Sequence, residues 1–266
     1  MKITVCFKVI PEFEGVIDAD WDDFSLSTDL GYVTRVLGCF DESALETALR
    51  LRTAWEAAGE KTECTALTAG PLPSSFCKTL FAVGFDRVRE ISGTGVLEFQ
   101  PRRTAALLGN CLKTAGFDLI LTGRQAGYAD TGMVPLLLAE ALGVPVITEV
   151  EEIAPCTGGI ELKRVSPAGR ERLRVRLPLL AVLGNSPVSA LRAATLGARM
   201  AASKRSAETL PAFVETPAFI EAGVSTKAVR FSRETRHRFC RFLPGGADLA
   251  QSAAEIQAEY LRGWER

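Results

Sequence analysis

The sequence predicts an α/β protein with a mostly parallel β-sheet and helices on both of its faces. Three observations support this fold class. Apolar runs of strand length alternate with amphipathic stretches of helix length as far as Pro145. Most of the strand candidates are solidly apolar, which is typical of parallel strands that are buried on both faces. The helix candidates end at glycines, which separate each helix from the strand that follows.

The first strand is expected from Ile3 to Ile10, a run rich in β-branched residues that ends at Pro11. A polar, glycine-containing excursion follows over residues 12–38, and its short apolar patches suggest a hairpin. Further apolar strands are expected over residues 62–68, 87–91 and 118–122. Because these strands alternate with helices, we expect them to lie in one parallel sheet.

The first helix is expected to begin at an Asp41 N-cap and to end at Gly59. Its apolar residues recur at helical spacing, so one face should pack against the sheet. Later helices are expected to reach Val83 before Gly84, to cover residues 103–115 before Gly116, and to cover residues 131–142 before Gly143.

After Pro145 the pattern changes to strands separated by turns. Strand-like segments cover residues 146–153, 160–165, 173–177 and 179–183. Turns rich in glycine separate the first three of these segments, at residues 157–159 and 166–170. We therefore expect an antiparallel extension of the parallel sheet.

Residues 206–266 are predicted to form a C-terminal arm that docks on a partner surface, whereas residues 1–205 form the α/β domain. The segment 206–246 contains three prolines and little periodicity, and it is too long for an ordinary loop. An amphipathic helix is expected over residues 248–261, and its apolar face requires a surface to pack against. Solvated disorder of the arm is the alternative.

The composition argues against several classes of function. The formal net charge is −1, so neither a nucleic acid nor an anionic membrane is an expected partner. No apolar run reaches membrane-spanning length and the N-terminus does not resemble a signal peptide, so we expect a cytoplasmic protein without membrane insertion. The seven cysteines show no CxxC spacing and are expected to be reduced, and His237 is the only histidine. We therefore expect neither a metal site nor a catalytic residue.

The carboxyl ends of parallel strands meet at one edge of a sheet, where open α/β folds bind ligands. The most informative segment there is the loop 122–132, which joins a strand to a helix and is rich in Gly, Ala, Thr and Asp. Backbone N–H groups at the following helix start are suited to an anion such as a nucleotide phosphate. The loop matches neither a P-loop nor the GxGxxG pattern. A plain glycine-rich connection explains the same residues equally well.

Four stretches of the sequence, in order, resemble the β subunit of electron-transfer flavoproteins. The segment Lys2 to Pro11 is similar to that family's opening strand and Lys-x-Val-Pro loop, and Phe40 to Leu51 is similar to its Asn-Pro-Phe-Asp-Glu-x-Ala-Leu-Glu helix start. Gly84 to Val88 resembles a Gly-Ala-Asp-Arg segment, and Leu121 to Pro145 resembles the nucleotide loop and its following helix. The resemblance covers most of residues 1–200 and agrees with a Rossmann-like fold.

The resemblance implies an electron-carrier subunit rather than a stand-alone enzyme. It implies a heterodimer with an α subunit that carries a redox-active FAD, while this chain holds AMP or a second FAD. Electrons would pass from a flavin-dependent dehydrogenase to an acceptor. The implied cofactor-binding positions are Val9, Ile10, Phe40, Asp41 and Thr68 near adenine and ribose, together with Gly123, Gln125, Asp130, Thr131, Gly132, Met133 and Val134. The phosphate would be held by Gln125 and by the backbone of residues 130–134. Leu196 would either dock a redox partner or cap the core.

Departures from the family's pattern leave the choice of nucleotide open. Cys39 precedes Phe40 where the family usually reads Asn-Pro, and Met133 occupies a position that is often Gln. The C-terminal arm resembles the longer arm of electron-bifurcating members, which favours a flavin. The alternative function is a universal-stress-type adenine-nucleotide-binding regulator without redox function, because that class shares the fold.

Overall fold

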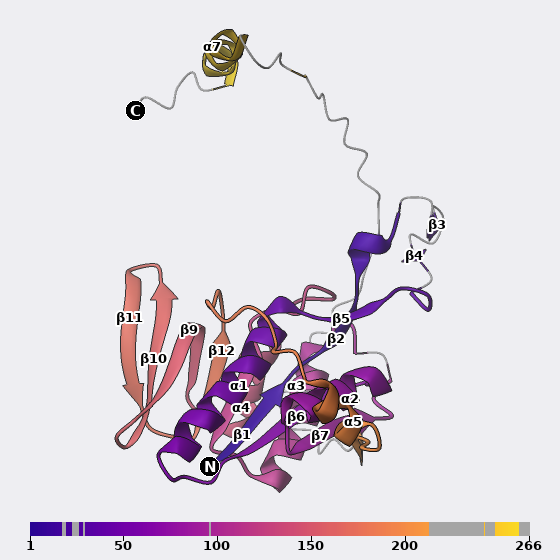
Figure 1. Cartoon of the computed structure of the whole chain (residues 1–266), viewed down its shortest axis with the longest axis vertical. Coiled ribbons are helices and arrows are strands. Elements are labelled where there is room, and N and C mark those ends of the chain that lie inside the picture. Colours follow the sequence, from indigo (N-terminus) through magenta and orange to yellow (C-terminus); the bar gives the residue numbers. More distant parts are fainter. Residues whose placement is uncertain are drawn as a thin grey trace. The chain divides into compact units, whose positions relative to one another are not determined.

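The computed structural model describes residues 1–17, 20–22, 27–28, 30–95, 97–212, 242 and 248–260. The chain divides into two compact units, Met1–Ala228 and Val229–Arg266. The first unit has the predicted α/β fold (Figure 1). In the described part of the second unit, helix α7 (Leu249–Tyr260) confirms the helix expected at residues 248–261.

The central sheet contains nine strands in the described part of the chain, in the order β11-β10-β9-β12-β8-β1-β6-β7-β13. Their bounds are β1 (Lys2–Cys6), β6 (Glu63–Ala69), β7 (Arg87–Ser92), β8 (Leu119–Gly123), β9 (Val146–Cys156), β10 (Gly159–Ser166), β11 (Gly169–Val175), β12 (Leu179–Leu183) and β13 (Glu208–Pro211). In the order of the sheet, each pair of neighbouring strands from β9 through β12, β8, β1, β6 and β7 to β13 is parallel. Strand β10 runs antiparallel to both β9 and β11. The predicted mostly parallel sheet and its antiparallel extension are therefore confirmed.

Helices cover both faces of the sheet, and each face has its own hydrophobic cluster among the described residues. On one face, α1 (Cys39–Ala57) and α2 (Ser74–Val83) pack on Ile3, Leu121 and other inward side chains. On the opposite face, α3 (Pro101–Ala115) and α4 (Val134–Leu142) pack on Ile120. A short helix, α5 (Leu196–Ala202), lies against α2 (Figure 1). Successive residues of β8 thus pack into the hydrophobic clusters on opposite faces of the sheet, because side chains alternate along a strand.

The single strand predicted from Ile3 to Ile10 forms two separate strands in the structure. Strand β1 ends at Cys6, and the short strand β2 (Val9–Pro11) pairs with β5 (Arg35–Leu37) in a separate antiparallel ribbon. The chain turns away because the N–H of Lys8 donates to the buried carboxylate of Asp41 instead of to a neighbouring strand. The excursion expected over residues 12–38 contains this ribbon, the 3-10 helix η1 (Phe13–Gly15), and the paired strands β3 (Trp21–Asp22) and β4 (Ser27–Thr28).

Helix boundaries follow the predicted glycines at their C-terminal ends but differ at three starts, one of which is that of α3 at Pro101 instead of residue 103. Helices α2, α3 and α4 end at Gly84, Gly116 and Gly143, each with a positive φ angle. Helix α1 begins at Cys39 with Gly38 as its N-cap, so the predicted Asp41 cap is wrong. Helix α4 begins at Val134 and not at Thr131.

Strand β13 lies within the segment 206–266, for which an arm was expected. It extends the parallel sheet beside β7, with Arg89 Nε 2.8 Å from Glu208 Oε2. Residues 213–241 of the predicted irregular segment, including His237, and residues 243–246 lie outside the described residues. Within the described part of the chain, no helix has the length and apolar character needed to span a membrane.

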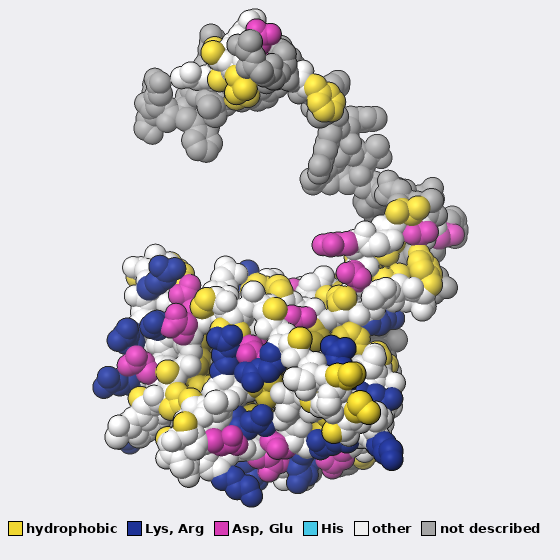
Figure 2. Space-filling view, viewed as in Figure 1, with side chains coloured by type: hydrophobic (Ala, Val, Ile, Leu, Met, Phe, Trp, Pro, Cys, Tyr) yellow, Lys and Arg dark blue, Asp and Glu magenta, His cyan; other side chains and the backbone are white. Residues whose placement is uncertain are grey.

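The visible surface carries both signs of charge without segregation, as Figure 2 shows. Ion pairs account for part of this pattern on the antiparallel extension, where Lys163 pairs with Glu152 and Arg164 with Glu171. All six described cysteines are free thiols, and Cys6, Cys64 and Cys77 are buried.

Candidate functional site

A cavity of about 330 Å³ lies at the carboxyl ends of β1, β6, β7 and β8. The strand order reverses direction at this point, because the chain adds β6 and β7 on one side of β1 and then crosses through α3 to add β8 on the other side. Such a switch point leaves a crevice between the two outgoing loops, and open α/β sheets bind ligands there. The position of the cavity is therefore a direct consequence of the topology.

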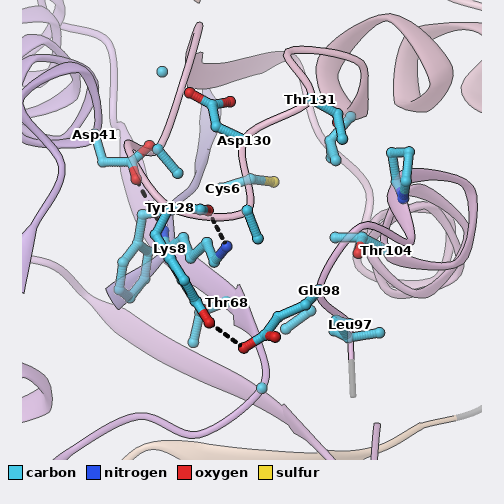
Figure 3. Close-up of a pocket in the computed structure, with 18 of the residues that line it drawn as sticks. Cys6, Lys8, Asp41, Thr68, Leu97, Glu98, Thr104, Tyr128, Asp130 and Thr131 are labelled. Atoms are coloured by element: carbon cyan, nitrogen blue, oxygen red, sulfur yellow. Dashed lines mark hydrogen bonds between the residues drawn. The ribbon is translucent and has the colours of Figure 1, made fainter. Parts of the chain in front are cut away.

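Four loops supply the walls of the cavity (Figure 3). The lining residues are 6–9 at the end of β1, 68–71 at the end of β6, 94–95 and 97–101 after β7, and 122–126, 128–132 and 134–135 at and after the end of β8. Helix α3 adds Thr104 and Leu108. The lining contains three basic side chains and three acidic ones: Lys8, Arg35, Arg124, Asp41, Glu98 and Asp130. A lining with balanced charge is not suited to hold a highly charged polyanion.

Asp41 is a buried carboxyl group in the first turn of α1, with 5% of its surface exposed. Its Oδ2 accepts a hydrogen bond from the N–H of Lys8 at 3.1 Å. Burial raises the pKa of Asp41 to about 7, and backbone groups of Lys8 and Gly123 and the charge of Lys8 oppose this rise. The carboxyl group of Asp41 is therefore poised to change its charge near neutral pH.

Lys8 and Tyr128 are joined beneath the loop that follows β8. Lys8 Nζ donates to the backbone carbonyl of Tyr128 at 2.7 Å and lies 5.3 Å from the centroid of its ring. The phenolic O–H of Tyr128 donates to Glu98 Oε1 at 2.8 Å. Burial lowers the pKa of Lys8, although Glu98, Asp41 and Asp130 act in the opposite direction. Burial and the Glu98 carboxylate raise the pKa of Tyr128 to about 12, so its hydroxyl remains a donor at neutral pH.

Arg124 links the cavity to strand β9. Its guanidinium carbon lies 4.7 Å from the centroid of the Phe40 ring, and its Nη1 lies 3.2 Å from Glu149 Oε2. Glu149 has a φ angle of 55° and belongs to a bulge, because Thr148 and Glu149 together oppose Val182 of β12. The bulge turns the Glu149 side chain toward Arg124.

Two buried polar atoms of the cavity wall have no hydrogen-bond partner among the described residues: Thr122 Oγ1 and Arg124 Nε. Thr122 stands at the end of β8 and is 4% exposed. A buried hydroxyl without a partner is costly, so a bound ligand that offers a partner would be favoured here.

The loop before α4 satisfies part of its own hydrogen-bonding capacity. The N–H groups of Gly127 and Gly132 donate to the Asp130 carboxylate at 3.4 and 3.3 Å, and the N–H of Met133 donates to Thr131 Oγ1 at 3.4 Å. These bonds are long and therefore weak. An anion at this loop would have to displace the Asp130 carboxylate from the N–H of Gly132, which is one of the predicted donors.

The sequence model of the electron transfer flavoprotein domain matches residues 32–212, which include β5 to β13 and most of the cavity wall. The chain belongs to the electron transfer flavoprotein family. It is 27% identical over 266 residues to "Putative electron transfer flavoprotein subunit YgcR" of Escherichia coli (strain K12), with 98% of each chain covered. It is 28% identical over 211 residues to electron transfer flavoprotein subunit beta of Mycobacterium leprae (strain TN), which covers 79% of this chain and 78% of the relative.

A third relative carries a different name. The chain is 29% identical over 188 residues to acryloyl-CoA reductase electron transfer subunit gamma of Anaerotignum propionicum, which covers 68% of this chain and 66% of the relative. These similarities confirm the resemblance to the β subunit of electron-transfer flavoproteins that the sequence indicated. They also support an electron-transfer role for this flavoprotein family member.

The structure brings most of the residues expected from the flavoprotein resemblance to one place. Those that line the cavity are Val9, Asp41, Thr68, Gly123, Gln125, Asp130, Thr131, Gly132 and Val134. Three others do not line it. Ile10 is buried, the ring of Phe40 packs against the guanidinium of Arg124, and the side chain of Met133 is exposed.

Sequence reasoning missed the cavity residues Glu98 and Thr104. It singled out the loops that contain Lys8, Arg124 and Tyr128 but named none of these three as a site residue. Glu98 lies in the loop after β7, and β7 is a parallel strand of the same sheet as β1 and β8. The rule that strand carboxyl ends share an edge could therefore have indicated Glu98.

Leu196 stands at the start of α5 with 75% of its surface exposed, and Met200 in the same helix is 68% exposed. The exposure of Leu196 does not fit the alternative that it caps the core. Thr195 caps this helix by accepting a hydrogen bond from the N–H of Ala198. A docking role for Leu196 stays a prediction.

Proposed function

We propose that this chain is the nucleotide-binding subunit of a two-chain electron-transfer flavoprotein, with AMP or the adenylate half of a second FAD in the cavity beside Asp41. The observation that carries the proposal is the cavity at the switch point between β1 and β8. It lies largely within the segment that matches the electron transfer flavoprotein domain.

The size of the cavity supports a ligand of this class. Its volume of about 330 Å³ is at the small end of the range of roughly 300–1,000 Å³ for small-molecule sites. This is enough for a mononucleotide, whereas the rest of a dinucleotide would extend past the mouth. The balanced charge of the lining also favours one or two phosphate groups over a triphosphate.

The chemistry of the walls supports an orientation for the nucleotide. Adenine and ribose would lie toward Val9, Asp41 and Thr68, where the Thr122 hydroxyl offers an additional hydrogen bond. The phosphate would lie toward Gln125 and the start of α4, where backbone N–H groups and the helix dipole favour an anion. Because Pro135 supplies no N–H, Val134 and the preceding loop would provide these donors.

The redox chemistry in this proposal belongs to a flavin. A bound flavin accepts and donates electrons reversibly, and the protein supplies binding, orientation and electrostatics. We propose an α subunit as the carrier of the redox-active FAD, a flavin-dependent dehydrogenase as the electron donor, and a cytoplasmic location. The C-terminal segment from residue 206 would contribute to the contact with the α subunit, and Leu196 would contact the redox partner.

Co-expression with the neighbouring reading frame tests this proposal. The purified complex is analysed by its absorbance spectrum and by chromatography of the nucleotides released with acid. One FAD and one AMP per heterodimer would identify an ordinary carrier, and two FADs would identify a bifurcation-type subunit. A chain without partner and flavin would overturn the proposal and favour the nucleotide-binding regulator.

A pair of variants ties the nucleotide to this cavity. Thr122→Val replaces the unpartnered hydroxyl by a methyl group, and we expect it to lower the affinity for the nucleotide about three- to tenfold. Thr79→Val is the matched control, because Thr79 is exposed on α2 and its hydroxyl bonds to Ser75 O. Equal nucleotide retention in both variants would place the ligand elsewhere.

A further inference from the structure

The hydrogen bond between Tyr128 and Glu98 joins two loops that line the cavity. Tyr128 belongs to the loop after β8, and Glu98 belongs to the loop after β7. In the sheet, β1 and β6 lie between these two strands. The residues that follow β1 and β6, including Lys8 and Thr68, line the cavity between the two loops, as Figure 3 shows. The Tyr128–Glu98 bond therefore spans the ends of two strands.

Tyr128 is held at three points. Its hydroxyl donates to Glu98 at 2.8 Å, its carbonyl accepts from Lys8 Nζ at 2.7 Å, and its ring centroid lies 5.1 Å from that of Phe13. Glu98 is exposed at its end of the bridge, whereas Tyr128 is half-buried. The outer hydrogen bond is thus the contact most accessible to competing water.

The backbone on both sides of Tyr128 has a left-handed conformation. Gly127 and Ala129, on either side of Tyr128, have φ angles of 86° and 48°. The left-handed conformation of Ala129 costs about 1 kcal/mol, so surrounding contacts must hold it. The three contacts of Tyr128 provide that restraint, and losing one of them would release part of the strain.

We propose that Tyr128 is a strap across the nucleotide cavity and that Glu98 is the positioning residue that keeps the strap closed. Nucleotide enters and leaves when the Tyr128–Glu98 bond opens. This inference rests on the proposed nucleotide site and adds a control of exchange to it. Because a closed strap obstructs both directions, opening it accelerates association and dissociation together and changes the affinity little.

The test measures exchange kinetics on the heterodimer after its own nucleotide has been removed. The probe is 1,N6-etheno-AMP, which is chased with excess AMP while its fluorescence is followed. Tyr128→Phe and Glu98→Ala each remove the bridging hydrogen bond, and we expect both rates to rise about three- to tenfold with Kd changed less than about twofold. Glu98→Gln keeps an acceptor for the phenol and is expected to stay within about twofold of the wild type.

Two further comparisons make the test specific. The double variant should exchange no faster than the faster single variant, because both substitutions remove the same contact. Tyr32→Phe is the control, since Tyr32 is 58% exposed and is not among the residues that line the cavity. Unchanged exchange in Tyr128→Phe and Glu98→Ala, or effects that multiply in the double variant, would overturn the strap.

Backbone hydrogen exchange of the ligand-free protein gives a readout that needs no nucleotide. Tyr128→Phe should increase exchange in residues 97–100, and Glu98→Ala should increase it in residues 126–132, because each loop restrains the other. If the wild type binds neither AMP nor FAD, the proposed function fails, and this measurement alone decides the strap. Exchange unchanged in the opposite loop would then overturn it.

Discussion

Gly123 and Asp41 meet so closely that no side chain fits between them. A methyl group built on Gly123 would lie 2.7 Å from Asp41 Oδ1 and 2.9 Å from the backbone nitrogen of Asp41. Gly123 ends β8, and Asp41 lies in the first turn of α1, so this contact fixes the wall of the cavity where the strand meets the helix.

Gly123→Ala should therefore weaken nucleotide binding. The added methyl group meets backbone atoms, which cannot move as cheaply as the end of a side chain, so α1 and β8 must separate. We expect a destabilisation of about 1–3 kcal/mol and a loss of nucleotide affinity of at least about tenfold. Gly197→Ala is the matched control, because its added methyl group has no atom within 4 Å. Urea unfolding and nucleotide titration measure both effects, and equal behaviour of the two variants would contradict the prediction.

Asp41 should make stability depend on pH. Its folded pKa of about 7 lies above the value of about 4 for an exposed aspartate. The folded state therefore keeps a proton that the unfolded state releases between roughly pH 4 and 7, and the free energy of unfolding falls as pH rises through that window. The slope from one group is at most about 1.4 kcal/mol per pH unit.

Asp41→Asn removes this titration and keeps an oxygen acceptor for the N–H of Lys8. The variant should gain stability relative to the wild type as pH increases from 5 to 8, as measured by urea unfolding at each pH. Asp248→Asn, at an exposed position, is the control for the same substitution. A constant difference between Asp41→Asn and the wild type would show that Asp41 does not titrate in this range.

Arg192, whose side chain is 40% exposed, should contribute more to stability than a more exposed arginine. Its Nε and Nη2 lie 2.9 Å from the carboxylate of Glu46, whose side chain is 5% exposed. Burial tends to raise the pKa of Glu46, but hydrogen bonds from Arg192 and Arg50 outweigh burial and lower it. Arg192→Met should cost about 1–3 kcal/mol, because a buried carboxylate loses its main partner.

The comparison for Arg192 is Arg170→Met on the antiparallel extension. Arg170 also pairs with a glutamate, at 3.2 Å, but its side chain is 81% exposed. Its removal should cost less than about 0.5 kcal/mol. Thermal or urea unfolding distinguishes the two, and a similar cost for both would refute the role assigned to burial.

Leu196 should affect electron transfer without affecting the fold. The side chain is 75% exposed, so Leu196→Glu should change stability by no more than about 0.5 kcal/mol. If Leu196 docks the redox partner, the rate of flavin reduction at low dehydrogenase concentration should fall at least about tenfold. Val165→Glu on β10 is the control for an added charge at an exposed apolar position. Normal reduction kinetics in Leu196→Glu would exclude the docking role.

Much of the fold could be predicted because its signals are local. The apolar run 179–183 forms β12 with the predicted bounds, and Gly84, Gly116 and Gly143 end helices where expected. A buried parallel strand is apolar throughout, and a helix often stops where a glycine can adopt a positive φ angle. These properties depend on residues within one segment, so they can be recognised without knowing its neighbours.

The sequence by itself thus determined the α/β class, most of the strands and helices, and the sheet edge that holds the cavity. Only the tertiary structure decided that β1 stops at Cys6, that Asp41 is buried instead of capping its helix, and that Tyr128 bonds to Glu98. Lys8 and Asp41 are 33 positions apart, and Tyr128 and Glu98 are 30 positions apart. Local periodicity contains no information about such pairs, because chain topology brings them together and desolvation then sets their chemistry.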